Sequence, residues 1–307
     1  MHARFRGLVA APFTPFKPDG SLNLAAIPAY AQLLRKNGVS AAFVCGTTGE
    51  GLSLTQAERM QVAEAWMKHA DDQLRVIVHV GHNCLPDAQE LTRHAAAIGA
   101  SATAAFAPCF FKPRDNDELL DWCGALAGAA PSLPFYYYNI PSMTGVNFKV
   151  APLLAKAADQ VPNFVGVKYT YEDLADYQEC VNFAQGRYDI LFGRDEKLME
   201  GWAHRALGAV GSTYSYAAPL YLQLIEHLQA GRPAEARKLQ DKAIAMIDAC
   251  ASVGVTHQAA TKSMIAWHGV DCGPMRLPVR TITAAQSAEL RRKLEAIDYF
   301  STACVPV

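Results

Sequence analysis

The sequence has almost no net charge. Its 28 lysines and arginines are balanced by 29 aspartates and glutamates over 307 residues, which leaves a formal charge of −1. No block of like charges forms a basic or acidic tail. Because nucleic acids and anionic membranes attract proteins through concentrated positive charge, we expect neither as a partner. With 51% hydrophobic residues, the chain is instead typical of a folded protein with one large core.

Paired cysteines are also lacking, since no Cys-x-x-Cys motif occurs and the cysteines are spread over a long chain. No apolar run is long enough to span a bilayer, and the first residues lack the apolar core of a signal peptide. We therefore expect a cytoplasmic protein with free thiols. The eight cysteines are Cys45, Cys84, Cys109, Cys123, Cys180, Cys250, Cys272 and Cys304.

Motifs for metals and nucleotides are missing as well. The nine histidines include no His-Glu-x-x-His motif or other ligand spacing. No glycine-rich loop ends in the Gly-Lys-Ser/Thr of a nucleotide-binding loop. A metal site is therefore not expected.

What the sequence does contain is a regular alternation of short apolar runs and amphipathic helical stretches. Ile27, Tyr30 and Leu34, for example, recur at helical spacing and put one apolar stripe against a sheet. Such alternation with short connections predicts parallel strands, and eight units predict an α/β fold of the closed (β/α)8 TIM barrel type. The expected strands are residues 8–11, 41–45, 76–80, 102–107, 135–138, 164–168, 190–192 and 209–211.

From about residue 219 onward the pattern changes to helices only, with turns marked by Gly231 and Gly273 beside prolines. No Ser/Gly linker, low-complexity tract or internal repeat separates this region from the rest. We therefore expect residues 1–218 to form the barrel that carries the active site. Residues 219–307 are expected to form a helical extension packed on that barrel.

Polar residues at the carboxyl ends of barrel strands converge on one mouth, where such barrels carry their active sites. One candidate is the loop of residues 46–51, Gly-Thr-Thr-Gly-Glu-Gly. The hydroxyls of Thr47 and Thr48, with exposed backbone N–H groups, make a small cradle for a carboxylate. Residues 55–58 read as a capping box that begins the next helix. The alternative for this segment is an ordinary turn between a strand and a helix.

Lys168 closes an apolar strand and is a candidate nucleophile, because a desolvated lysine amine can attack a carbonyl. Period-2 geometry puts Gly166, Lys168 and Thr170 on one face, with the glycine expected to leave room beside the lysine stem. The alternative is a strand-end lysine that reaches out to water.

Three further features are candidates with open alternatives. Tyr138 ends a strand of three tyrosines and is either a proton carrier or part of aromatic packing. Asp195 and Glu196 are either acceptors for the hydroxyls of a polyol or charges that favour a helix start. Ser212 adds a hydroxyl after the eighth expected strand. Cys45 has no histidine placed by sequence to activate it, so we do not expect a cysteine nucleophile.

Four motifs follow one another at the expected strand ends, and together they carry a resemblance. In this order and spacing they resemble the N-acetylneuraminate lyase/dihydrodipicolinate synthase family, from about Gly7 to about Phe300. The motifs are GTTGE at 46–50, YNIP at 138–141, GVK at 166–168 and GRDE at 193–196.

The resemblance implies a class I, Schiff-base aldolase on a (β/α)8 barrel, commonly a homotetramer, that needs neither metal nor organic cofactor. It implies that Lys168 forms the Schiff base and that Tyr138 transfers protons. It also implies a set of residues that bind the substrate and its pyruvate part: Thr47, Thr48, Thr170, Gly193, Asp195, Glu196 and Ser212.

Within the family, the synthase branch has an arginine for a second carboxylate where this sequence has Met143. Methionine cannot pair with a carboxylate, and the acids at 195 and 196 are similar to the sialic acid lyase pattern. The implied reaction is cleavage of N-acetylneuraminate to N-acetylmannosamine and pyruvate. In one departure, Phe110 and Phe111 replace a tyrosine that in many relatives relays protons across a subunit contact, so Tyr138 needs another partner, at Thr47, at Thr48 or through water.

Two other functions stay open at this point. One is another 2-keto-3-deoxy sugar acid aldolase or dehydratase, or dihydrodipicolinate synthase, which would keep the lysine and tyrosine but change the hydroxyl-binding set. The other is a barrel that binds a keto acid without catalysis, because a fold does not dictate a function.

Overall fold

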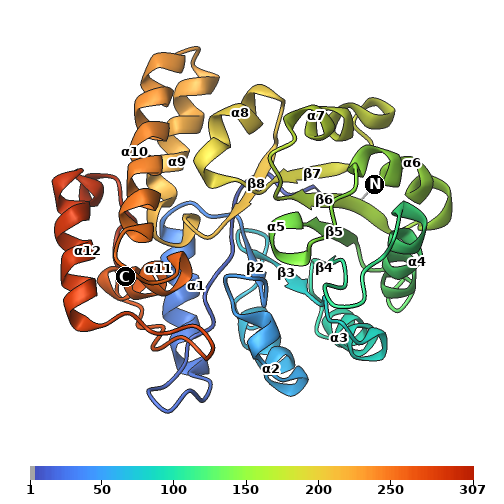
Figure 1. Cartoon of the computed structure of the whole chain (residues 1–307), viewed down its shortest axis with the longest axis horizontal. Coiled ribbons are helices and arrows are strands. Elements are labelled where there is room, and N and C mark those ends of the chain that lie inside the picture. The colour runs from blue at the N-terminus through green and yellow to red at the C-terminus, as the bar shows by residue number, and fades with distance from the viewer. Residues whose placement is uncertain (1–3) are drawn as a thin grey trace.

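The computed structural model describes residues 4–307, and at its centre eight parallel strands form a closed barrel in sequence order, as predicted (Figure 1). The strands differ from the expected ones by at most one residue at either end. Their register places Tyr138 beside Lys168 and Lys168 beside Leu191. The strands are β1 (Gly7–Ala10), β2 (Ala41–Val44), β3 (Arg75–His79), β4 (Ala102–Phe106), β5 (Phe135–Asn139), β6 (Phe164–Tyr169), β7 (Asp189–Phe192) and β8 (Gly208–Gly211).

Helices surround the barrel, and the main core lies between their apolar faces and the strands. The predicted capping box is present at Thr55 and Glu58, where it begins the second helix. The helices around the barrel are α1 (Ile27–Lys36), α2 (Gln56–Met67), α3 (Leu85–Ala97), α4 (Asn116–Ala127), α5 (Pro141–Thr144), α6 (Val150–Gln160), α7 (Leu174–Asn182), α8 (Leu198–Ala203) and α9 (Tyr214–Gln229).

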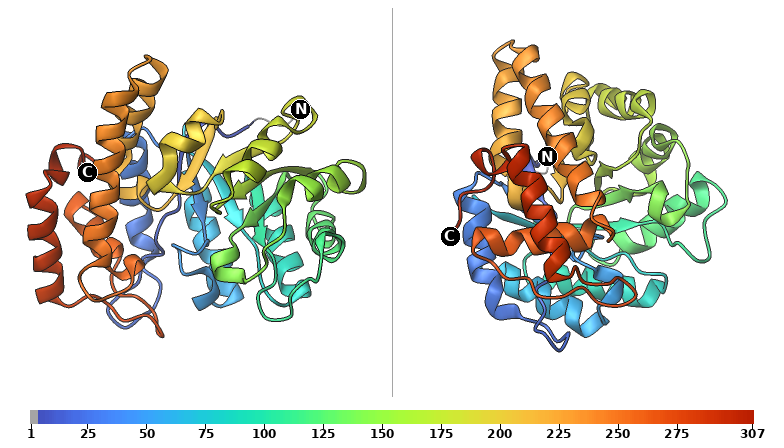
Figure 2. Two further views of the ribbon diagram at one scale, coloured as in Figure 1. Left: turned by 45° about the horizontal axis from the view of Figure 1, so that its top comes forward. Right: turned by 60° about the vertical axis from the view of Figure 1, so that its left-hand side comes forward.

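The C-terminal helices α10 (Pro233–Ala251), α11 (His257–Ile265) and α12 (Ala284–Ala296) gather on one side of the barrel (Figure 2). Helix α9 contacts β1 and β8 and therefore belongs to the barrel ring. The expected division after residue 218 falls inside α9, because Pro219 does not break this helix. Ala217, with φ −137° and ψ 22°, leaves helical geometry just before Pro219 and lets the helix continue.

The barrel interior is a second, smaller apolar cluster that is filled in layers. At the amino ends of the strands, Asp189 accepts hydrogen bonds from the Tyr136 hydroxyl, at 2.8 Å, and from the Phe5 N–H, at 2.9 Å. At the carboxyl ends, Phe43 and Tyr138 pack edge to face, with ring centroids 5.5 Å apart. The barrel interior is therefore closed at the amino ends of the strands, where the polar groups bond to one another, and opens at the carboxyl ends.

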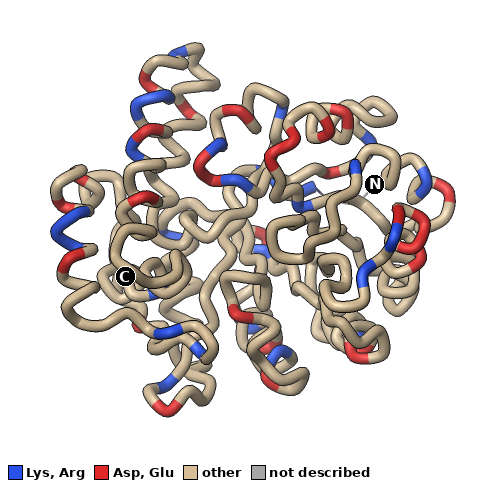
Figure 3. Tube along the Cα trace, in the orientation of Figure 1, with Lys and Arg blue, Asp and Glu red and all other residues tan. Residues whose placement is uncertain are grey.

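Charged residues of both signs are interspersed along the outer helices (Figure 3). This distribution follows the balanced composition. Across residues 4–307, no helix has both the length and the apolar character needed to cross a membrane.

Candidate active site

The nine site residues proposed from the sequence all line one cavity of about 320 Å³ at the carboxyl ends of the strands. They come from five different strand ends, so the barrel closure alone brings them together. The nine are Thr47, Thr48, Tyr138, Lys168, Thr170, Gly193, Asp195, Glu196 and Ser212.

Lys168 lies near the end of β6 and is buried, with 5% of its surface exposed. Its Nζ lies 4.0 Å from the ring centroid of Tyr138 and 4.3 Å from that of Phe43. Burial among aromatic rings excludes the alternative of a lysine that reaches bulk water. The amine is instead held at the cavity, where it can meet a ligand.

Gly166 has a different role from the expected one. A Cβ at this position would lie 2.1 Å from the backbone oxygen of Asp189 and 2.6 Å from the Tyr136 ring. The glycine therefore makes room for the backbone of strand β7 and for the Tyr136 ring inside the barrel, not for the stem of Lys168.

Tyr138 is 3% exposed, and its ring packs against Phe43 and His79. Its hydroxyl lies 3.4 Å from Oγ1 of Thr47. One of the expected partners is thus found within the same chain. With the Lys168 amine over its ring and a threonine hydroxyl beside its own hydroxyl, this phenol lies where proton transfer at the cavity is possible.

The loop of residues 46–51, here called the threonine loop, is a tight turn between β2 and the 3-10 helix η2 (Gly51–Ser53). The N–H of Glu50 donates to the Thr47 carbonyl, and that of Gly51 donates to the Gly46 carbonyl, both at 3.1 Å. A Cβ at Gly51 would lie 1.9 Å from the Cys45 carbonyl oxygen, so only glycine fits there. The turn presents Thr47 and Thr48 to the cavity.

Asp195 and Glu196 are neighbours in sequence but differ in environment. Asp195 is buried, and its Oδ2 accepts hydrogen bonds from the hydroxyl of Thr213, at 2.6 Å, and from its N–H, at 3.1 Å. Its Oδ1 has no hydrogen-bond partner among residues 4–307. Burial raises the pKa of this carboxyl from 3.8 to about 6, against the lowering effect of the Thr213 hydrogen bonds. Glu196 is half-buried and pairs with Arg194 at 2.7 Å.

Two glycines make room for polar atoms at the side of the cavity formed by the ends of β6, β7 and β8. A Cβ at Gly193 would lie 2.0 Å from Oγ1 of Thr170, and a Cβ at Gly211 would lie 1.9 Å from Oδ1 of Asp195. The hydroxyl of Thr170 is buried without a partner among the described residues. Thr170 and Asp195 therefore each keep one buried polar atom without a partner among the described residues, packed against a glycine beside the cavity.

Cys45 lies beside the threonine loop, and burial raises the pKa of its thiol to about 11. The thiol stays protonated at neutral pH, which agrees with the expectation that it is no nucleophile. Outside the cavity, the ligand atoms of His82, Cys84 and Asp87 lie within 4.8 Å of one another. This partly exposed group does not line the cavity of Lys168.

Comparison with known proteins decides the family. Residues 4–297 match the model of the dihydrodipicolinate synthetase family. The chain belongs to this family. The Gallus gallus N-acetylneuraminate lyase is 42% identical over 297 residues, 96% of each chain, and the Mus musculus N-acetylneuraminate lyase is 40% identical over 305 residues, 98% of this chain and 95% of that one. The structure of the Proteus mirabilis N-acetylneuraminate lyase superposes with a TM-score of 0.93 at 41% identity and covers 97% of this chain and 100% of that chain.

Membership of the dihydrodipicolinate synthetase family confirms the resemblance read from the four motifs. Sequence reasoning missed the part of the cavity wall that the extension supplies. Ile247 of α10, with His257 and Gln258 of α11, lines the cavity opposite the strand ends. Burial lowers the pKa of His257, and the charge of Glu196 acts in the opposite direction. No local signal in the sequence points these residues at the barrel mouth.

Proposed function

We propose that this chain is a class I aldolase that cleaves N-acetylneuraminate to N-acetylmannosamine and pyruvate. The observation that carries the proposal is one cavity that joins a buried lysine, a tyrosine whose ring centroid is 4.0 Å from the lysine amine, and a wall of hydroxyls and carboxylates. The sequence identity of about 40% to N-acetylneuraminate lyases along nearly the whole chain supports the substrate.

In the proposed mechanism, the amine of Lys168 attacks the C2 ketone of the open-chain sugar acid, and loss of water gives an iminium. The hydroxyls of Thr47 and Thr48 hold the C1 carboxylate. Tyr138 takes the proton of the C4 hydroxyl as the C3–C4 bond breaks, and the electron pair moves into the iminium to give an enamine. Protonation of the enamine and hydrolysis release pyruvate, so the chemistry requires neither metal nor organic cofactor.

The rest of the cavity binds the sugar chain. Glu196 and Asp195 supply carboxylates as acceptors for hydroxyl groups, and Ser212 and Thr170 supply hydroxyls that donate or accept hydrogen bonds. Gly193 leaves the space that Thr170 occupies. Met143, 60% exposed, offers no cation for a second carboxylate, which argues against the synthase reaction.

The chain is further proposed to act as a cytoplasmic homotetramer. Phe110 and Phe111 follow β4 with their rings 5.1 Å apart and are 77% and 86% exposed, which is typical of an interaction surface. The eight cysteines, all within residues 4–307, are free, which suits a reducing compartment. Replacing both phenylalanines by serine should dissociate the assembly in sedimentation experiments.

Borohydride reduction in the presence of pyruvate tests the Schiff base directly. We expect a covalent adduct on the tryptic peptide that contains Lys168, detected by mass spectrometry, and no adduct in Lys168→Met. An adduct on another lysine alone would overturn the assignment. A panel of N-acetylneuraminate and other 2-keto-3-deoxy sugar acids then separates the lyase from related aldolases, and turnover of none of them would indicate a non-catalytic barrel.

A further inference from the structure

A buried ion pair joins the threonine loop to the C-terminal extension. Oε1 of Glu50, in the loop, lies 2.7 Å from Nζ of Lys262 on α11, although the two residues are 212 positions apart in sequence. Their side chains are only 7% and 1% exposed, respectively. Two charges withdrawn so far from water are stable only when their remaining hydrogen bonds are also satisfied.

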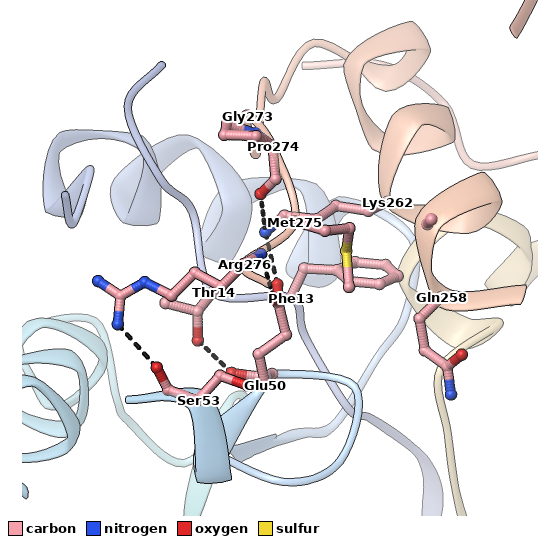
Figure 4. Close-up of polar contacts among 12 residues, drawn as sticks. Phe13, Thr14, Glu50, Ser53, Gln258, Lys262, Gly273, Pro274, Met275 and Arg276 are labelled. Carbon is pink, nitrogen blue, oxygen red and sulfur yellow. Dashed lines mark hydrogen bonds and ion pairs between the residues drawn. The ribbon is translucent and has the colours of Figure 1, made fainter. Parts of the chain in front are cut away.

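Both partners meet that condition (Figure 4). The ammonium of Lys262 also donates to the Pro274 carbonyl at 2.7 Å, and Oε2 of Glu50 accepts the N–H of Arg276 at 2.8 Å. Each carboxylate oxygen of Glu50 thus receives a donor from the extension. The pair lies against the ring of Phe16, whose centroid is 4.2 Å from Nζ of Lys262.

On the loop side, Glu50 has a left-handed backbone, with φ 54° and ψ 32°. A residue with a side chain adopts this conformation only when its surroundings hold it there. The N–H of Glu50 closes the turn on the Thr47 carbonyl, and Thr14 donates its hydroxyl to the Gly49 carbonyl at 2.7 Å. The conformation of Glu50 therefore determines how the turn presents Thr47 and Thr48.

On the extension side, Lys262 lies one helical turn after Gln258, so the two side chains share a face of α11. Gln258 lines the catalytic cavity, as does its neighbour His257. The ion pair thus links the threonine loop to helix α11, and both of these segments contribute residues to the same cavity. Neither Glu50 nor Lys262 lines that cavity, although Glu50 lines a second cavity that shares Thr47 and Gln258 with it, so we expect each to act on a bound substrate through its neighbours.

We propose that Glu50 and Lys262 are positioning residues through which the C-terminal extension holds Thr47 and Thr48 at the place where they bind the carboxylate of the 2-oxo acid. The inference rests on the proposed function, because it presupposes a 2-oxo acid bound to Lys168. It assigns the extension a part in substrate affinity in addition to its part in the fold.

Pyruvate trapping at varied pyruvate concentration tests this role, because pyruvate consists of little more than the ketone and the carboxylate. Lys262→Met keeps the length of the side chain and leaves the Glu50 carboxylate buried with one donor fewer. A small displacement of a binding group can cost about 100-fold, so we expect the half-saturating pyruvate concentration to rise by roughly 10–100-fold. The trapping rate at saturation should fall much less, because Lys168 and Tyr138 stay in place.

The double variant Glu50→Gln/Lys262→Met removes both charges and serves if the single variant does not fold. Because no unpaired charge is buried in the double variant, its thermal stability should return toward the parental value. The threonine loop still lacks its ion pair to α11, so the half-saturating pyruvate concentration should stay high. Asp189→Asn is the matched control, because Asp189 is also a buried carboxylate and lies at the opposite end of the barrel. It should lower the melting temperature and leave the half-saturating concentration at the parental value.

The outcomes separate this inference from the proposed function. If the parent protein gives no pyruvate adduct, the Schiff-base function itself is wrong. If the parent is trapped and the folded Lys262 variants keep its half-saturating concentration, the ion pair only holds the extension on the barrel and the positioning role is wrong. Equal increases in the Lys262 variants and in Asp189→Asn would also overturn it, because they would reflect general loss of stability.

Discussion

Tyr136 and Tyr138 belong to the same strand and point into the same barrel, but they meet opposite surroundings. The hydroxyl of Tyr136 donates to Asp189 in the closed lower layer, and burial raises its pKa well above 10. The hydroxyl of Tyr138 lies at the open mouth beside Thr47, and its ring lies below the amine of Lys168. Identical side chains two residues apart thus have different environments, and in the proposed mechanism the one at the mouth, Tyr138, transfers protons.

The difference comes from the strand ends and not from the tyrosines. Parallel strands in a barrel put all their carboxyl ends at one mouth, where loops of any length can add polar groups. The amino ends are covered by Phe5 and Arg75, whose guanidinium lies 3.8 Å from the Phe5 ring centroid. A buried polar group there must be satisfied internally, whereas one at the mouth can be left for a ligand.

The largest effect is expected from removing the two phenolic hydroxyls in turn. Tyr138→Phe should lower kcat for N-acetylneuraminate by roughly 10²–10⁴, the usual contribution of general acid–base catalysis. Tyr136→Phe removes one of the hydrogen bonds that Asp189 accepts and should lower the free energy of unfolding by about 1–3 kcal/mol, with kcat near the parental value. Steady-state kinetics and urea unfolding of both variants measure the contrast. Parental kcat in Tyr138→Phe would mean that this phenol is only packing.

A smaller effect is expected from Glu196→Gln, which changes the polar side of the mouth without touching Lys168. Hydrogen bonds to charged groups contribute about 1.5–3 kcal/mol, so kcat/KM for N-acetylneuraminate should fall by roughly 10–150-fold. Pyruvate has no hydroxyls for Glu196 to bind, and its trapping on Lys168 should be unchanged. An equal loss in both assays would mean that Glu196, through Arg194, holds the mouth together instead of binding sugar.

The sequence was sufficient for the strands and for the residues at their ends, because both depend on local patterns. Strand limits follow from apolar runs, and the parallel barrel then places Thr47, Tyr138 and Lys168 at one mouth without further information. Family motifs supported the same positions. For this reason the whole proposed site lines a single cavity.

The failures concern contacts between segments far apart in the chain. Gly166 makes room for Tyr136 and β7, which no local pattern indicates. The expected boundary after residue 218 falls inside helix α9, which continues through Pro219 because Ala217 leaves helical geometry just before it. The bond from Lys262 to Glu50 joins residues 212 positions apart, and only the packed extension reveals it. Tertiary packing decided each of these features.

Asp195 combines properties of both ends of the barrel, and its effect is expected in the pH dependence of stability. It is buried and bonded to Thr213, as Asp189 is to Tyr136, but it lies at the mouth with one oxygen free. In the folded protein its pKa is raised to about 6, so between about pH 4 and pH 6 the native state binds a proton that the unfolded state has lost. Stability from this group is therefore complete below pH 4 and is lost as the pH rises through 6.

Asp195→Asn removes that titration while keeping an acceptor for Thr213. A shift of about two pKa units corresponds to roughly 3 kcal/mol, so the free energy of unfolding of the variant, relative to the parent, should rise by up to that amount between pH 4 and pH 7. Urea unfolding at pH 4, 5, 6 and 7 and at one protein concentration measures the difference. Glu196→Gln should show a smaller trend in the same direction, because the charge of Glu196 is one of the causes that raise the pKa of Asp195. If Asp195→Asn and the parent instead differ by the same amount at all four pH values, the hydrogen bonds from Thr213 fully offset the cost of burying the Asp195 carboxylate. The contrast between the hydrogen-bonded polar groups at the amino ends of the strands and the unpartnered ones at the mouth would then not extend to this residue.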